Sequence, residues 1–170
     1  MIDFTCVGYD IRKWPQNGYL TADATEWEVI DNLFDRAKNE VGTHENDFQL
    51  LDIRTNEDCD HLMDIISAVS GAALVCIELP SLVVDALQKD KGWDIKRNVS
   101  NNNWTRLGYD VCDVNGFFSI LHMGKLSDNG IELFPNDQIM EAAFLAQAAN
   151  ILVPDHAPFV VTSIRIAINS

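Results

Sequence analysis

The residue types that could perform covalent chemistry lie between residues 110 and 156. Cys112 could act as a nucleophile, with His122 or His156 as its base. Asp110 or Asp113 would then orient the base. The signal is weak, because any chain with cysteine, histidine and aspartate permits such a triad. Cys112 also has no basic neighbour that would lower its pKa. A small cysteine-dependent hydrolase is therefore the alternative hypothesis.

Signatures of metal, phosphate and nucleotide chemistry are absent from the sequence. There is no GxxxxGK[ST], GxGxxG, GxSxG or HExxH motif. The four histidines contain no pair at i, i+4, and the four cysteines contain no CxxC pair. A carboxylate site from Asp110 and Asp113 is weaker still. We therefore expect no metal and no cofactor, and we interpret the cysteines as reduced, buried thiols.

His156 lies between two prolines in the segment VPDHAPF at 153–159. Pro154 and Pro158 stiffen the backbone and favour extended conformations at the residues that precede them. Such a segment delivers the chain into the following apolar run at a fixed angle. The imidazole nitrogens can bond a backbone carbonyl or a carboxylate. We therefore interpret His156, Pro154 and Pro158 as a structural latch.

The elements that must position these residues follow from hydrophobic periodicity. Strand patterns occupy 2–11, 47–54, 72–79, 104–114 and 159–168, and helix patterns occupy 25–40, 56–69, 81–89 and 137–150. Run 72–79 is apolar throughout, which is typical of a central strand covered on both faces. Gly108 is placed at a bulge. No linker divides the chain, so we expect one α/β domain over residues 1–170, with a mixed sheet covered by helices.

Local signals mark the helix ends and faces. Thr25 and Glu28 are spaced as a capping box, and Asn56 is expected to cap the second helix. Trp27, Ile30, Leu33, Phe34 and Ala37 share one face of the first helix, and Leu62, Ile65, Ile66 and Val69 share one face of the second. In the last helix, Ile139, Ala143, Phe144 and Gln147 recur at helical spacing.

Net charge is the strongest compositional signal. The chain has 26 acidic and 12 basic residues and a net charge of −14. Thirteen of the acidic residues fall within 20–64, against three basic ones, so this segment carries −10. Such a surface repels phosphates and attracts a basic partner. The plain alternative is that the charge serves solubility alone.

The helix faces opposite the apolar stripes supply the candidate partner-binding residues. We assign them as Glu28, Asp31, Asp35, Glu40, Glu57, Asp58, Asp60 and Asp64. The first residues, MIDFTCVGYDIRKW, lack the basic region of a signal peptide, and no segment holds 18 uninterrupted apolar residues. We therefore expect a soluble cytoplasmic protein that makes no direct contact with nucleic acid or membrane.

Two motifs carry a resemblance to a known family. LGYDVCD at 107–113 and VPDHAPFVVTSIRI at 153–166 resemble a family of small bacterial proteins with an LGYDVAD strand and a terminal VPEHAPF strand. Some members look like immunity proteins of polymorphic toxin systems, including contact-dependent growth inhibition. The family often shows SGLSNCGY after the first motif, whereas this chain has FSILHMGKL at 118–126.

The resemblance implies a cytoplasmic antidote without catalytic activity, which blocks one cognate toxin domain, often a nuclease. A nuclease carries basic residues to hold phosphates, so charge and resemblance agree. We expect an immunity protein that neutralises a basic RNase or DNase by occluding its active site or substrate groove. A regulatory adaptor without a toxin is a third, weaker hypothesis.

Overall fold

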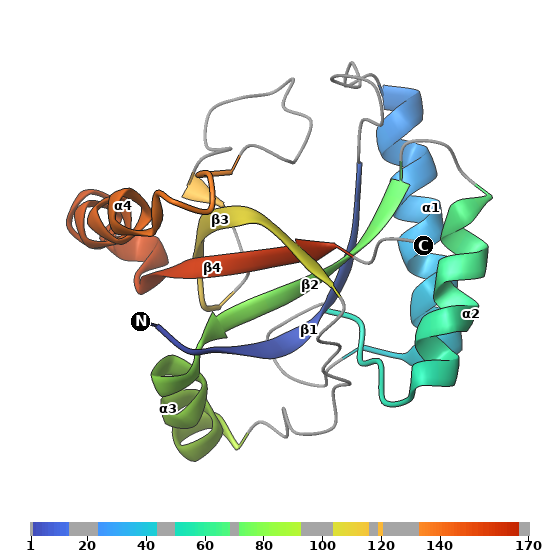
Figure 1. Cartoon of the computed structure of the whole chain (residues 1–170), viewed down its shortest axis with the longest axis horizontal. Coiled ribbons are helices and arrows are strands. Elements are labelled where there is room, and N and C mark those ends of the chain that lie inside the picture. The colour runs from blue at the N-terminus through green and yellow to red at the C-terminus, as the bar shows by residue number, and fades with distance from the viewer. Residues whose placement is uncertain are drawn as a thin grey trace.

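The computed structural model describes residues 2–13, 24–43, 50–68, 72–92, 104–115, 119–120 and 133–166. Figure 1 shows helices arranged around one sheet. The elements are β1 (Phe4–Lys13), α1 (Ala24–Val41), α2 (Asn56–Ser67), β2 (Ala72–Pro80), α3 (Ser81–Lys91), β3 (Thr105–Asp113), α4 (Ile139–Leu152), a 3₁₀ turn (Pro154–His156) and β4 (Phe159–Ile166). The predicted α/β class is confirmed.

The sheet has the strand order β1-β2-β4-β3. Across the described strands every pairing is antiparallel, which differs from the mixture of directions expected. The successive strands β1/β2 and β3/β4 lie side by side, but the chain between them returns in the opposite direction, which an alternation of strands and helices does not by itself determine. Here β4 lies between β2 and β3 and is antiparallel to both. As predicted, β2 is a central strand and is buried on both faces.

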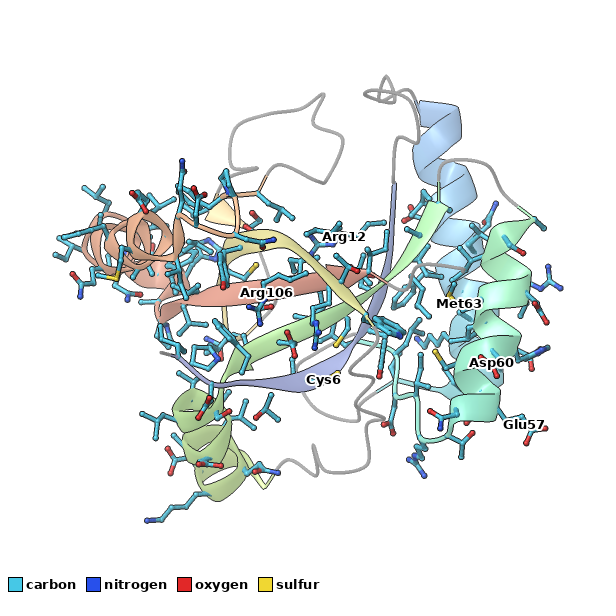
Figure 2. The ribbon with its side chains drawn as sticks, in the orientation of Figure 1. Cys6, Arg12, Glu57, Asp60, Met63 and Arg106 are labelled. Carbon is cyan, nitrogen blue, oxygen red and sulfur yellow. The ribbon has the colours of Figure 1, made fainter. Side chains whose placement is uncertain are left out.

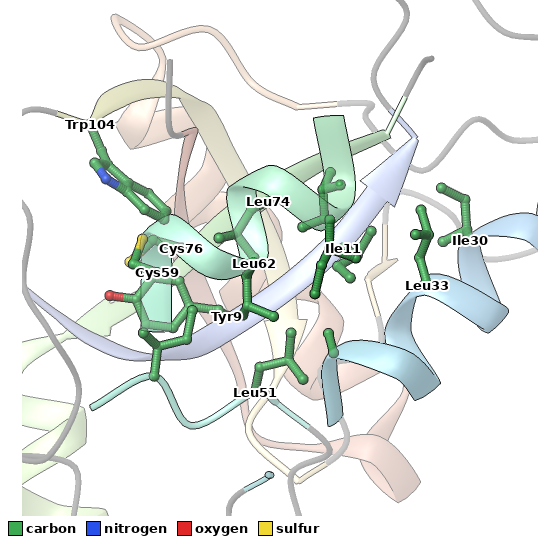
Figure 3. Packing of buried hydrophobic residues seen from close by; sticks show 14 of the residues in the cluster. Tyr9, Ile11, Ile30, Leu33, Leu51, Cys59, Leu62, Leu74, Cys76 and Trp104 are labelled. Carbon is green, nitrogen blue, oxygen red and sulfur yellow. The ribbon is translucent and has the colours of Figure 1, made fainter. Parts of the chain in front are cut away.

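One face of the sheet packs against α1 and α2. Tyr9 and Ile11 from β1 lie on this face with Leu74 and Cys76 from β2 (Figure 3). Ile30, Leu33 and Ala37 from α1 and Leu62, Ile65 and Ile66 from α2 meet them. These are the apolar stripes that the helical periodicity predicted. The side chains of Trp27 and Val69 lie outside the described residues.

The remaining helices pack elsewhere on the sheet. α4 packs on β3 and β4 at the opposite end from α1 and α2 (Figure 1). Its contact with Val111 and Phe159 runs through Ala142, Ala146 and Ala149. On the other face of the sheet, α3 places Val84 against β2 in a cluster that includes Val75, Ile77 and Leu79.

A short segment pairs with each of the two edge strands, β1 and β3. The Tyr9 and Leu51 backbones exchange two hydrogen bonds, as do the Tyr109 and Phe134 backbones. Of the strand expected at 47–54, residues 47–49 lie outside the described residues, Leu51 makes isolated bridges, and residues 50 and 52–54 are not strand. The predicted bulge in β3 is present between Arg106 and Gly108. A Cβ at Gly108 would collide with the Phe134 carbonyl, which explains the glycine.

The helix ends agree with the sequence in part. α3 ends at Gly92, which has a φ of 71° in the left-handed region, as expected for a C-terminal glycine. The N-cap of α2 is Thr55, whose hydroxyl accepts a hydrogen bond from the Asp58 amide at 3.1 Å. Asn56, the expected cap, is instead the first helical residue. The side chains of the predicted capping box, Thr25 and Glu28, lie outside the described residues.

Candidate protein-binding surface

The acidic candidate residues lie on two helices that pack next to each other. α1 and α2 both contact the sheet and also contact each other. The apolar stripe of each helix faces the sheet. The acidic residues on the opposite side of each helix therefore point away from the sheet. Figure 2 shows Glu57 and Asp60 on the side of α2 that faces away from the sheet.

Seven of the eight candidates can be placed in the structure. Asp31, Asp35, Glu40, Glu57, Asp60 and Asp64 are exposed, and Asp58 is half-buried. Glu28 belongs to α1, but its side chain lies outside the described residues. We call the seven placed residues the acidic surface. The structure therefore brings together carboxylates from two separate stretches of sequence, 31–40 and 57–64.

The spacing of the acidic surface produces two rows of carboxylates. Glu57, Asp60 and Asp64 recur at i, i+3 and i+7 along α2, while Asp31 and Asp35 lie one turn apart on α1. Like charges at this spacing repel one another. A cationic partner that inserts between them would remove that repulsion, so the arrangement favours binding of lysine and arginine side chains.

Nearby basic residues offset only part of this charge. Arg54 pairs with the buried carboxylate of Asp52 at 2.9 Å. His61 Nε2 lies 3.3 Å from Glu40 Oε2, which joins α2 to α1 and holds Glu40 in place. Arg36 and Lys38 are exposed on α1. The acidic surface thus keeps an excess of negative charge, and Glu40 has a partner within the chain.

Cys112 lies in the interior of the sheet. Its side chain is fully buried on β3, and burial, followed by the neighbouring Asp110, raises the pKa of the thiol well above its usual value. Thiolate is the reactive form of cysteine, so this environment disfavours nucleophilic chemistry. His156 is exposed beyond the end of β3, and His122 lies outside the described residues. The structure assembles no accessible triad from the residues it describes.

The latch segment joins the two resemblance motifs. The imidazole Nδ1 of His156 lies 4.0 Å from Asp113 Oδ2, and Asp113 is buried at the end of β3. The Val114 amide donates to the Pro158 carbonyl at 3.1 Å. Pro154 opens the 3₁₀ turn. Ala157 is extended with ψ 150°, as expected before proline, whereas Val153, which precedes Pro154, has ψ 63° and does not have the expected extended conformation. These contacts hold the start of β4 against the end of β3.

We expect His156→Ala to lower the free energy of unfolding by at most about 1 kcal/mol, because the ring is half exposed and its ion pair is screened by water. Urea unfolding of the variant and the wild type measures this difference. Asp155→Ala, which alters an exposed neighbour, is the matched control. A loss exceeding about 3 kcal/mol would contradict the exposed position of the ring.

A group of polar and charged side chains on the α1/α2 face of the sheet was not predicted from the sequence. We call Glu78, Arg106, Ser163 and Arg165 the ionic centre. Ser163 Oγ donates to Glu78 Oε1 at 2.7 Å and accepts from Arg106 Nε at 2.8 Å. The Glu78 carboxylate lies 3.7 Å from the guanidinium of Arg106 and 3.8 Å from that of Arg165. Glu78 is buried, and both arginines are partly exposed.

The ionic centre lies between the apolar clusters beneath α1/α2 and α4. Arg106 lies over the rings of Phe4 and Tyr109 at 5.2 and 5.3 Å, and Arg165 donates to the Trp104 carbonyl at 2.7 Å. Figure 2 shows Arg106 over the middle of the sheet. The signal for this group in the sequence was one charged residue in each of two largely apolar strands, Glu78 in β2 and Arg165 in β4.

A second buried ion pair lies on the opposite face of the sheet. Arg12 from β1 approaches Asp10 at 3.4 Å and Asp110 at 3.7 Å. Burial raises the pKa of Asp10, although Arg12 acts against it. The Asp110 carboxylate also accepts hydrogen bonds from the Ser119 hydroxyl and the Val111 amide. The LGYDVCD motif therefore contributes two structural carboxylates, Asp110 here and Asp113 at the latch.

Neither a metal site nor a membrane-spanning helix is found among the residues that the structure describes. They contain no group of three or more His, Cys, Asp or Glu side chains arranged to hold a metal ion. None of their helices combines the length and the apolar character needed to cross a membrane.

The comparisons with known proteins add no relative. No protein-family model matches the chain, and the searches of curated proteins and of solved structures return no match.

Proposed function

We propose that this protein is an immunity protein that binds a basic toxin domain and neutralises it. The observation that carries the proposal is the acidic surface, seven carboxylates on the two adjacent helices α1 and α2, six of which are exposed. The resemblance of residues 107–113 and 153–166 to immunity proteins of contact-dependent inhibition systems supports the same function. The place of action is then the cytoplasm of the protected cell.

In the proposed mechanism, the carboxylates of the acidic surface occupy the substrate site of the toxin and block it. A nuclease toxin holds its substrate through lysine and arginine side chains that contact phosphates. The rows formed by Asp31 and Asp35 and by Glu57, Asp60 and Asp64 would take the place of those phosphates. Their field would accelerate the encounter, and carboxylates desolvated at the centre of the interface would slow dissociation. This mechanism needs no catalytic group in the immunity protein.

The proposal divides the molecule into a scaffold and a binding region. The two resemblance motifs form adjacent strands, β3 and β4, and their buried side chains contact each other or the sheet. The acidic surface belongs to α1 and α2, which those motifs do not include. Recognition would therefore be able to change without disturbing the strands.

Co-expression tests the proposal directly. The gene immediately upstream is expected to encode a long secreted protein that ends in a small basic toxin domain. Expression of that domain should stop growth, and co-expression of this protein should restore it. The purified protein should inhibit the nuclease at a one-to-one molar ratio. Growth arrest that this protein does not relieve would contradict the proposal.

We expect Cys112→Ser to retain full protection against the toxin, since the buried thiol lies within the scaffold. The free energy of unfolding should fall by about 1 kcal/mol, because a buried hydroxyl needs a hydrogen-bond partner. Growth assays and urea unfolding measure the two effects, with Cys112→Ala as the matched control. Loss of protection by a folded Cys112→Ser variant would instead favour a role for the thiol in function.

A further inference from the structure

The outer face of α4 is a row of exposed apolar side chains. Met140, Phe144, Ile151 and Leu152 are 62%, 69%, 79% and 77% exposed. They make up four of the six large hydrophobic side chains that are exposed among the described residues. An apolar stripe of this kind marks an interaction surface. The acidic surface, at the other end of the sheet, does not include it.

The inner face of α4 explains why large residues remain outside. Only alanines, Ala142, Ala146 and Ala149, are fully buried along the helix. Small side chains allow the helix to lie close to β3 and β4, and the larger residues are then left on the opposite side. Phe144 was placed in a predicted stripe with Ile139 and Ala143, and its exposure shows that the buried face is a different one.

We propose that this stripe pairs with the same stripe of a second copy of the chain, with the two α4 helices antiparallel about a two-fold axis. The exposed positions Met140, Phe144, Gln147 and Ile151 are spaced 4, 3 and 4 residues apart. This is the spacing of a coiled-coil seam, and the order of the spacings is the same from either end of the helix. Met140 therefore meets Ile151 of the second copy, and Phe144 meets Gln147. A two-fold interface requires such self-complementarity.

Charge also favours a second copy at this site. Two molecules that each carry −14 repel one another, so they associate most readily through a surface with few charges. Glu141 is the single ionisable residue between Ile139 and Leu152. In the antiparallel register it faces Ala148 of the second copy rather than another carboxylate. With one carboxylate, this helix offers little negative charge to a basic toxin domain.

The proposed dimer keeps the acidic surfaces apart. α1 and α2 lie at the opposite end of the sheet from α4 (Figure 1). Pairing through α4 therefore places the two acidic surfaces at the outer ends, where each remains free. A helix of 14 residues is about 21 Å long, so the interface is small and the dimer is weak. Its dissociation should be visible on dilution.

Sedimentation equilibrium over a range of concentrations measures the dimer. The wild type should shift from 19.0 kDa toward twice that mass as concentration rises. Phe144→Glu should raise the dissociation constant at least about tenfold, because it places two charges in the seam. Leu82→Glu is the matched control: Leu82 is 84% exposed on α3, and this variant should dimerise as the wild type does. A monomeric wild type at all concentrations, or a Phe144→Glu variant that dimerises normally, would overturn the proposal.

Cross-linking tests the register without relying on the folding of Phe144→Glu. Positions 140 and 151 are about 16 Å apart along one helix, which is too far for a disulfide within one copy. With oxidised glutathione, the double variant Met140→Cys/Ile151→Cys should form a covalent dimer, while Met140→Cys alone should not. Cross-linking by Met140→Cys alone, or none in the double variant, would overturn the antiparallel arrangement. The four native cysteines are buried.

Discussion

Reversal of Asp31 and Asp35 to lysine is expected to lower the association rate constant with the toxin domain at least about tenfold at low salt. Both side chains are exposed on α1, on the side away from Leu33 and Ala37. The variant should therefore remain folded while the attraction between the two proteins falls. In the wild type the rate should decrease steeply with added salt, and in the variant it should depend on salt much less. Surface plasmon resonance at several salt concentrations measures both.

The control must separate local charge from net charge. Asp85→Lys/Asp90→Lys changes the net charge of the molecule by the same amount, and both residues are exposed on α3, away from the acidic surface. This variant should associate at close to the wild-type rate. Equal slowing by both double variants would show that the net charge alone steers the encounter. Association that neither salt nor reversal changes would place the interface elsewhere on the molecule.

Glu78→Ala is expected to lower the free energy of unfolding by about 3 kcal/mol. The carboxylate is buried between the guanidinium groups of Arg106 and Arg165 and accepts the Ser163 hydroxyl hydrogen bond. Its removal leaves two partly buried positive charges next to each other. Both arginines keep some exposure, so the loss should lie at the lower end of the range for buried ion pairs. Urea unfolding measures it.

Two controls define the source of that loss. Asp60→Ala removes an exposed carboxylate from α2 and should change the free energy of unfolding by less than about 0.5 kcal/mol. In a double-mutant cycle, Glu78→Ala combined with Arg106→Ala should cost less than the sum of the two single changes, because the groups interact. Additive losses would mean that the ion pair contributes nothing and that Glu78 acts through packing alone.

The elements that local periodicity governs were predictable from the sequence. A helix repeats every 3.6 residues, so burial of Leu33 and Ala37 on α1 also determines that Asp31 and Asp35 face outward. The continuous apolar run of β2 likewise indicated a central strand. Gly92 marked the end of α3, because its left-handed φ favours glycine, and Gly108 marked the bulge in β3, where a Cβ would collide with the Phe134 carbonyl.

The outer stripe of α4 could not be predicted in the same way. The helix is apolar on nearly all sides, so hydrophobic periodicity identifies no unique buried face. Close packing against β3 and β4 places the alanines on the buried side of α4, and this packing depends on the shape of the sheet. Exposure of Phe144 and Ile151 is therefore a property of the tertiary structure.

The sequence by itself determined the α/β class, the helix faces that carry the acidic residues, and the concentration of negative charge in 20–64, because these depend on composition and local repeats. Only the tertiary structure decided which distant residues meet. Glu78 contacts Ser163, 85 positions later in the chain, because β4 lies between β2 and β3 and pairs with both. Strand order is decided by the packing of the whole sheet, which no local pattern encodes.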